Sequence, residues 1–283
     1  MYYDLHSHTY YSDGTLSPTE LVQRAHTNGV KVLALTDHDV THGLAEATTA
    51  AVGLGLTLIP GAEISVTWEG QTLHIVALNI DPENRVLQAG LANLRDARVA
   101  RAQEIGRKLE KKGIANAYAG AQAYARGAII SRTHFVHFLV DNGHARDLKQ
   151  VFKAFLNKGG FGYAPGHWAS LEEAVCWIKG AGGCAVIAHP ARYKLGAAKL
   201  RRLLNEFKEI GGVGLEVVAG SHSPDDCFRF ARLTQEFGFF ASVGSDYHGP
   251  IHAWTDLGRL LPLPDGCRPI WQAWEGATSI YPN

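Results

Sequence analysis

The chain has 283 residues, of which 46% are hydrophobic and 10% aromatic, enough to bury the core of one large α/β domain with an insertion. Its formal net charge is zero, with 27 basic and 27 acidic residues. The chain therefore has no overall positive charge that would attract a polynucleotide or an anionic membrane, and we expect phosphate binding to be local. The first residues show no basic and apolar leader pattern, and the sequence has no long apolar run and no Cys-x-x-Cys pair, so we expect a cytoplasmic protein with reduced thiols.

The first predicted strand ends in the motif Asp4-Leu5-His6-Ser7-His8-Thr9. Side chains alternate along a strand, so His6 and His8 point the same way and could bind one ion. Asp13, in the Ser-Asp-Gly that follows, brings a carboxylate to the same end of the strand. Taken alone the pair is a weak signal, because both histidines could equally be surface or core residues.

A βαβ unit follows this strand. Ser17-Pro18-Thr19-Glu20 is a capping box that begins a helix, Gly29 ends the helix, and the apolar run over residues 30–35 predicts a buried parallel strand that ends at His38. A second helix, over about 41–53, leads to a strand over 56–60 that is expected to end at Glu63. Residues 64–79 are typical of a hairpin, with His74 in the returning strand.

From about residue 84 to 158 we predict a mainly helical insertion between two parts of a barrel, residues 1–83 and 159–283. One helical stretch in it is rich in basic residues: Arg95, Arg98, Arg101, Arg107, Lys108, Lys111 and Lys112. These cations could be a solvated helix face, or some could reach into the site as a lid. Ser131-Arg132-Thr133-His134 follows within the same insertion.

Alternating strands and helices resume after Gly159-Gly160. Strands over 184–188, 214–218 and 239–243 alternate with helices near 170–180, 196–209 and 223–236, and a short helix spans Trp271 and Trp274. His189 follows the first of these strands, and Asp246 and His248 follow the last. A closed barrel brings all its strand ends to one mouth, so we predict an α/β fold, an irregular TIM-like (β/α)7 barrel with a helical lid.

The residues at the strand ends are metal-ligand types without a thiolate: His6, His8, Asp13, His38, Glu63, His74, His189, Asp246 and His248. Nine ligands are too many for one ion and suit two or three divalent ions that share a bridging carboxylate. Mixed imidazole and carboxylate donors favour Mn²⁺, Fe²⁺ or Zn²⁺ without choosing among them. Such ions make hydroxide near neutral pH and stabilise a displacement at phosphorus, so the predicted reaction is hydrolysis of a phosphate ester.

The ordered motifs resemble those of the PHP (polymerase and histidinol phosphatase) superfamily. They are His6-x-His8, Asp13, Thr36-Asp37-His38, Gly61-x-Glu63, His74, Ala188-His189-Pro190 and Gly244-Ser245-Asp246-x-His248. Within the superfamily, the opening motif and Ser131-Arg132-Thr133-His134 are similar to the bacterial 3',5'-nucleoside bisphosphate phosphatases, whose relatives also act as 5'-3' exoribonucleases on short RNA.

The resemblance implies which residues hold each ion. The first would be held by His6, His8, Glu63 and Asp246, the second by Asp13, His38 and His248, and the third by Glu63, His74 and His189, with manganese as the expected metal. Glu63 would be the bridge. Asp13, His38, Glu63, Asp246 and His248 would be the catalytic residues, around a hydroxide that attacks a 3'-phosphate in line without a covalent intermediate.

We predict substrate contacts at Arg101, Arg132, Arg192, His134 and His222, because a planar guanidinium holds two phosphate oxygens at once. Each arginine could instead form a surface salt bridge, and His134 could merely cap a helix. We assign structural roles to the remaining histidines: His26, His42, His137, His144, His167 and His252.

The expected substrate is a small nucleotide or short RNA, with no obligatory protein partner. Two alternatives stay open. One is a histidinol-phosphate phosphatase, a class that often has histidine where this chain has Asp13, and the other is a polymerase-associated or regulatory PHP module.

Overall fold

The computed structural model describes residues 2–250 and 255–275, so His252 lies outside the described residues. Seven described strands follow one another around a barrel: β1 (Tyr3–Asp4), β2 (Val32–Leu35), β3 (Thr57–Trp68), β4 (Gln71–Leu78), β6 (Cys184–Ile187), β7 (Gly214–Ala219) and β8 (Phe240–Gly244). Leu5 N donates to Val243 O at 2.9 Å, and Asp246 N donates to His6 O at 2.9 Å, so the first and last strands also meet. The predicted barrel is confirmed and is nearly closed.

The middle of the sheet differs from the prediction of separate strands before and after Glu63. β3 is one strand of 12 residues that runs through Glu63, and its far end also pairs with the short β5 (Ala169–Ser170). A turn at Glu69 and Gly70, both with positive φ, reverses the chain into β4, which confirms the predicted hairpin. β4 then pairs antiparallel with β6 as well, so the barrel is not entirely parallel.

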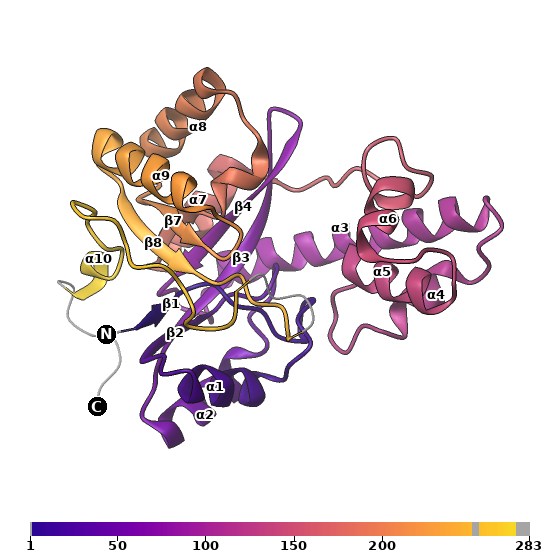
Figure 1. The fold of residues 1–283 in the computed structure, drawn as a ribbon, viewed down its shortest axis with the longest axis horizontal. Helices are drawn as coiled ribbons and strands as arrows, with labels where there is room; N and C mark the ends of the chain where they lie inside the picture. Colours follow the sequence, from indigo (N-terminus) through magenta and orange to yellow (C-terminus); the bar gives the residue numbers. More distant parts are fainter. Residues whose placement is uncertain (1, 251–254, 276–283) are drawn as a thin grey trace.

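Helices cover the outside of the barrel (Figure 1). α1 (Pro18–Thr27) and α2 (Leu44–Leu54) pack on one side, and α7 (Leu171–Gly180), α8 (Ala197–Glu209) and α9 (Pro224–Phe237) lie on the other. Reciprocal capping boxes at Ser17, Ser170 and Ser223 fix where three of these helices begin. α10 (Gln272–Glu275) follows Trp271, whose ring stacks on Tyr3 with centroids 3.8 Å apart.

Apolar side chains fill the inside of the barrel and the space under its helices. Leu5, Ala34, Val76, Val186 and Ala188 belong to the inner cluster. A larger cluster joins the outer faces of β3, β4, β6 and β7 to α7, α8 and α9. This packing holds the strand ends in fixed positions, which is what a multi-ligand site requires.

The insertion forms a lobe beside the barrel (Figure 1). It contains the end of α3 (Arg85–Glu110), α4 (Ala117–Gln122), α5 (Arg132–Asp141), α6 (Leu148–Val151) and a π-helical turn, Phe152–Leu156. Leu87, Leu91 and Leu94 of α3 pack in the barrel cluster, whereas residues from Ala102 onward pack in a separate cluster of the lobe. The division at residues 84 and 158 stays a prediction. No helix within the described ranges is both long and apolar enough to span a membrane.

Candidate metal centre

The structure brings all nine predicted ligands to one end of the barrel, although they are spread from residue 6 to residue 248. The first close group joins residues that follow β1, residues that follow β8 and the middle of β3: His6, His8, Glu63 and Asp246. His6 Nε2 and His8 Nε2 each lie 3.3 Å from Glu63 Oε2, and His8 Nε2 lies 3.2 Å from Asp246 Oδ1. All four residues are buried.

A second close group shares His8 with the first and adds Asp13, His38 and His248. His248 Nε2 lies 3.2 Å from Asp13 Oδ1, and His38 Nε2 lies 3.8 Å from the same oxygen. Asp13 sits in the loop after β1, where Gly14 approaches the backbone of His8 so closely that a Cβ would lie 2.4 Å from its carbonyl oxygen. The Ser-Asp-Gly motif thus needs glycine to hold its carboxylate beside the histidines.

Glu63 faces the remaining histidines with both of its oxygens. Its Oε1 lies 2.9 Å from His74 Nδ1 and 2.9 Å from His189 Nε2, and its Oε2 lies 2.9 Å from His38 Nδ1. The third close group comprises His38, Glu63 and His74. The family resemblance instead implied Glu63, His74 and His189 for the third ion. Glu63 therefore belongs to the first and third groups and contacts His8 and His38 of the second.

The donor atoms of this cluster fit divalent metal ions. Buried atoms that form no hydrogen bond occur on seven of the nine ligands: His6 Nε2, His8 Nε2, Asp13 Oδ1, His38 Nδ1, Glu63 Oε2, His189 Nδ1 and Asp246 Oδ1. An unpartnered buried polar atom costs about 1–3 kcal/mol, so such a concentration indicates another kind of partner. Ligand atoms that share an ion at about 2.1 Å lie about 3.0–3.4 Å apart, close to the separations observed in the first group.

Electrostatics keeps Glu63, His8 and His74 in metal-binding protonation states. Burial alone would raise the pKa of Glu63, but His38, His74 and His6 outweigh it and hold that pKa well below its ordinary value. Burial lowers the pKa of His8 to about 3 and that of His74 to about 4. Metal ions bind carboxylates and neutral imidazoles, so these three side chains need to lose no proton at neutral pH to act as ligands. At His6, His38 and His248 the neighbouring carboxylates outweigh burial and raise the pKa, so these three imidazoles would release a proton on binding a metal ion.

Two buried carboxylates accept hydrogen bonds from the ligand residues and from the loop that carries them. The sequence alone assigns no role to either carboxylate. Glu216, in β7, accepts from His6 Nδ1 at 2.8 Å and from the backbone N–H of His189 at 2.5 Å. Asp37 accepts from the Thr9 N–H at 2.7 Å and from the Thr9 and Ser12 hydroxyls at 2.6 Å each. Such contacts fix the orientation of a metal-binding histidine or loop.

The backbone is strained at three of the strand ends that carry polar side chains. Asp39, His189 and Asp246 have φ values of 53°, 27° and 55°, in the region that L-residues rarely adopt. Strain of this kind persists when the surrounding structure over-determines the conformation, and it clusters at functional sites.

A cationic cleft of about 180 Å³ opens beside the cluster, between barrel and lobe. Asp13, His38 and His74 line it on the barrel side, and the other walls include Arg98, Arg101, Arg132, Thr133, Phe152, Tyr163 and Trp168. Arg98 is buried and bound to Asp39 Oδ2 at 2.6 Å. Burial, Arg132 and Arg98 lower the pKa of Arg101, although an arginine stays charged at neutral pH. The cleft therefore concentrates positive charge beside the carboxylates and histidines.

Arg101 and Arg132 of the five predicted substrate contacts line this cleft. The Arg101 Nε donates to Ala164 O at 3.0 Å, and the guanidinium of Arg132 lies 5.3 Å from the ring centroid of Phe152. Within the described residues neither arginine forms an ion pair with a carboxylate, so both guanidinium groups can bind an anion.

The other three predicted contacts already have protein partners. His134 Nδ1 accepts from the Ser131 N–H at 3.0 Å, so this residue does cap α5. Arg192 pairs with Asp246 Oδ2 at 2.7 Å and donates to Ser221 Oγ at 3.1 Å. His222 Nδ1 donates to Val217 O at 2.9 Å, and its ring stacks on Phe230.

Known proteins are similar to this chain over most of its length. The model of the PHP domain matches residues 4–217. A 3',5'-nucleoside bisphosphate phosphatase from Chromobacterium violaceum is 48% identical over 273 residues, which cover 96% of each chain. A 5'-3' exoribonuclease, Rnm, from Escherichia coli is 45% identical over 96% of this chain and 94% of its own.

Solved structures show the same fold. An amidohydrolase from Chromobacterium violaceum, solved with sulfate and without metal, superposes with a TM-score of 0.93 at 47% identity and covers 97% of this chain and 96% of its own. A protein from Bifidobacterium adolescentis described as a metal-dependent phosphoesterase has a TM-score of 0.81 at 29% identity, over 96% and 94% of the two chains. The chain belongs to the PHP domain family.

Proposed function

We propose that this protein is a metal-dependent phosphoesterase that removes the 3'-phosphate of nucleoside 3',5'-bisphosphates and leaves nucleoside 5'-monophosphate. The same site would release mononucleotides from the 5' end of short 5'-phosphorylated RNA. The observation that carries the proposal is the cleft with three guanidinium groups that opens directly on the histidine and carboxylate cluster. Relatives named for both activities are 45–48% identical over nearly the whole chain.

The cluster would hold two or three divalent ions, with Mn²⁺ first and Fe²⁺ or Zn²⁺ as alternatives. His6, His8, Glu63 and Asp246 would hold one ion, Asp13, His38 and His248 a second, and Glu63, His74 and His189 a third. When bound, such ions supply a nucleophilic hydroxide at neutral pH and neutralise charge that develops at phosphorus. Glu63 would join the ions, since its two oxygens face different histidines.

The lobe would act as the lid that recognises the second phosphate. Arg101 and Arg132 would bind the 5'-phosphate, while the ion pair with Asp39 fixes Arg98 beside them. A phosphate held there would orient the substrate with its 3'-phosphate over the metal ligands. This arrangement explains how a protein without net charge can prefer a bisphosphate over a simple ester.

Aromatic walls would complete the substrate site. Trp168 stacks against Arg98 and Arg101, with guanidinium-to-centroid distances of 5.1 Å and 5.4 Å. Tyr163 and Phe152 line the same cleft. These rings can stack on a nucleobase and exclude water from the reacting phosphate.

Residues outside the cleft would position its groups. His134 accepts a hydrogen bond at Nδ1, so its neutral ring carries the proton on Nε2, and its cap fixes the start of α5, where Arg132 lies. Arg192 would orient Asp246 through their ion pair, and His222 would support the same region through its backbone contacts. The four free cysteines fit the proposed cytoplasmic location, since reducing conditions there keep thiols unpaired.

Phosphate release tests the proposal. Protein loaded with Mn²⁺ is expected to release phosphate from adenosine 3',5'-bisphosphate, and much more slowly from histidinol phosphate. Asp13→Ala or His248→Ala should remove the second ion and nearly all turnover, which elemental analysis and the same assay measure together. Cleavage of histidinol phosphate without cleavage of the bisphosphate would overturn the proposal.

A further inference from the structure

Charge is distributed very unevenly between the lobe and the barrel. Residues 84–158 contain 14 of the 27 Lys and Arg residues but only 5 of the 27 Asp and Glu residues. Eight of these cations are exposed at or beyond the end of α3: Arg107, Lys111, Lys112, Arg126, Arg146, Lys149, Lys153 and Lys158. The zero net charge of the whole chain therefore hides a strongly basic lobe, which can bind a polyanion locally.

The segment that returns from the lobe to the barrel connects this basic surface to the cleft. Tyr163 and Trp168 of this segment line the cleft, and Lys108 Nζ donates to Tyr163 O at 2.5 Å. Two residues before Tyr163, Phe161 is 55% exposed. Lys112 Nζ lies 5.1 Å from the centroid of the Phe161 ring, and Phe155 packs edge-on against it at 6.2 Å.

An exposed aromatic ring beside a lysine, joined to a cationic cleft by a short segment of chain, has the composition of a single-strand binding surface. In such surfaces bases stack on aromatic rings while cations contact the phosphates, and this recognition tolerates any sequence. Phe161 is not part of the buried cluster of the lobe, and more than half of its surface is free to contact a ligand. Its place two residues before Tyr163, which lines the cleft, together with the basic charge around it, selects a polyanion that has flat apolar groups.

We propose that the lobe surface around Phe161 and Lys112 binds single-stranded RNA beyond the nucleotide that occupies the cleft. This inference rests on the proposed function and extends it, because it makes RNA longer than one nucleotide a preferred substrate. The 5'-terminal nucleotide would lie in the cleft, and the chain that continues from its 3'-phosphate at the metal cluster would turn back over the lobe to reach Phe161.

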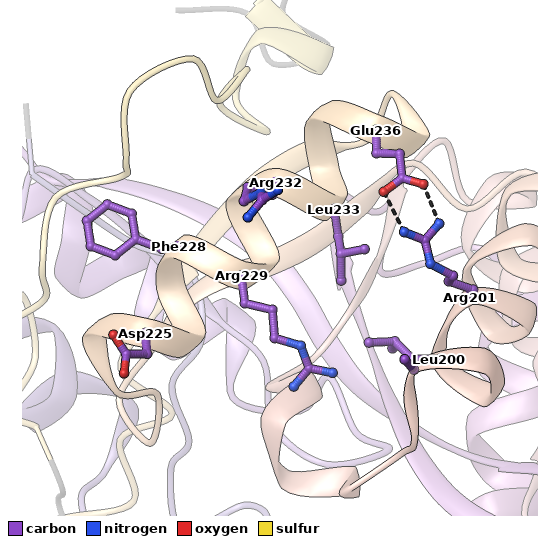
Figure 2. A pocket seen from close by; sticks show the side chains of 9 residues that line it. Leu200, Arg201, Asp225, Phe228, Arg229, Arg232, Leu233 and Glu236 are labelled. Atoms are coloured by element: carbon purple, nitrogen blue, oxygen red, sulfur yellow. Dashed lines mark hydrogen bonds and ion pairs between the residues drawn. The ribbon is translucent and has the colours of Figure 1, made fainter.

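A second basic surface with an exposed phenylalanine provides a comparison (Figure 2). It is a pocket of about 420 Å³ between α8 and α9, lined among others by Phe228, Arg229 and Arg232. Arg201 in this pocket is paired with Glu236, and Asp225 adds a further negative charge. None of the residues that line it belongs to the metal cluster, so a chain bound there would not be guided into the cleft.

The experiment compares substrates of increasing length. Wild-type protein with Mn²⁺ is assayed at low salt on adenosine 3',5'-bisphosphate and on 5'-phosphorylated oligoribonucleotides of 2 to 12 residues. We expect kcat/KM to rise with length. Phe161→Ala should lower the ratio of kcat/KM for the 12-residue RNA to that for the bisphosphate by about fivefold or more, the low end of a lost stacking contact.

Lys112→Gln should lower the same ratio and reduce the slope of log kcat/KM against log salt for the 12-residue RNA by about 0.7, as for one lost phosphate contact. Phe228→Ala and Arg229→Gln are the matched controls and should leave the ratio unchanged.

Two results would overturn the inference while leaving the proposed function intact: turnover of the bisphosphate with no gain from RNA length, or an unchanged ratio in both lobe variants. An equal loss in the Phe228 control would also overturn it. Failure of the wild type on the bisphosphate itself would contradict the proposed function instead.

Discussion

Glu216→Gln tests how much the carboxylate of Glu216 contributes to metal affinity. This carboxylate contacts two of the predicted metal ligands and is not itself a predicted ligand. Glu216 accepts from His6 Nδ1 through one oxygen and from the His189 N–H through the other, and it is buried. Glutamine has the same shape but only one acceptor oxygen. If that oxygen stays on His189, the amide NH₂ faces His6 and favours the tautomer protonated on Nε2, the atom that must bind metal. If the amide turns round, its NH₂ opposes the His189 N–H.

Either arrangement sacrifices one hydrogen bond to a charged acceptor, worth about 1.5–3 kcal/mol. At about 1.4 kcal/mol per factor of ten, this corresponds to roughly 10- to 100-fold weaker metal binding, the range found when the outer partner of a metal-binding histidine is removed. The loss should appear in the ion held by His6, because the Nε2 of His6 is the atom whose protonation changes.

Isothermal titration of the metal-free protein with Mn²⁺ measures this effect without relying on turnover. We expect one binding step of Glu216→Gln to weaken by 10- to 100-fold while the other steps change little. Glu209→Gln, at an exposed position near the end of α8, is the matched control and should titrate like the wild type. Unchanged binding in Glu216→Gln, within twofold, would refute the argument that this carboxylate fixes the tautomer of His6.

Three further predictions concern stability. Asp39→Ala should lower the free energy of unfolding by about 3–5 kcal/mol, because it leaves the buried Arg98 without its ion pair; a urea titration that shows less than about 1 kcal/mol would contradict this. Burial lowers the pKa of His134, so on acidification the unfolded chain binds a proton at this residue before the folded chain does. The free energy of unfolding should therefore fall as the pH drops below about 6.5. His134→Gln should remove that part of the pH dependence, which thermal melts from pH 5 to 8 measure. Removal of metal ions with a chelator should abolish turnover and lower Tm. Adding Mn²⁺ at 100 times its Kd should restore about 2.7 kcal/mol to the free energy of unfolding. Equal Tm values with and without the chelator would count against a metal centre in the buried cluster.

Most of the ligand candidates could be identified from the sequence because they lie within an apolar β-rich run or a few residues after one; Asp13 lies farther on, in the loop after β1. His38 and His189 lie three and two residues after the ends of strands of four buried or partly buried residues, and Asp246 lies two residues after the end of β8. The barrel follows from the same pattern, since function at many strand ends requires those ends to meet. The antiparallel placement of β4 could not be predicted, because a hairpin signal fixes one partner of a strand and says nothing about the other.

Supporting residues were harder to find, because their roles depend on long-range contacts. Glu216 is a single acidic residue inside an apolar strand, a signal that was present in the sequence, but its partners His6 and His189 lie 210 and 27 residues away. Arg98 looked like one more cation on a basic helix until its ion pair with Asp39 placed it in the cleft. Arg192 was predicted to bind phosphate, and its ion pair with Asp246 could not be seen in the sequence.

The most direct test of the account is the specificity ratio between adenosine 3',5'-bisphosphate and adenosine 3'-phosphate, measured as kcat/KM with Mn²⁺. The two substrates offer the same 3'-phosphate to the metal centre, and they differ only in the group proposed to bind Arg101 and Arg132. The account predicts a preference of at least about tenfold for the bisphosphate, the effect of one charge-assisted contact, and a collapse of that preference in Arg132→Gln. Equal kcat/KM for the two substrates in the wild type would contradict it.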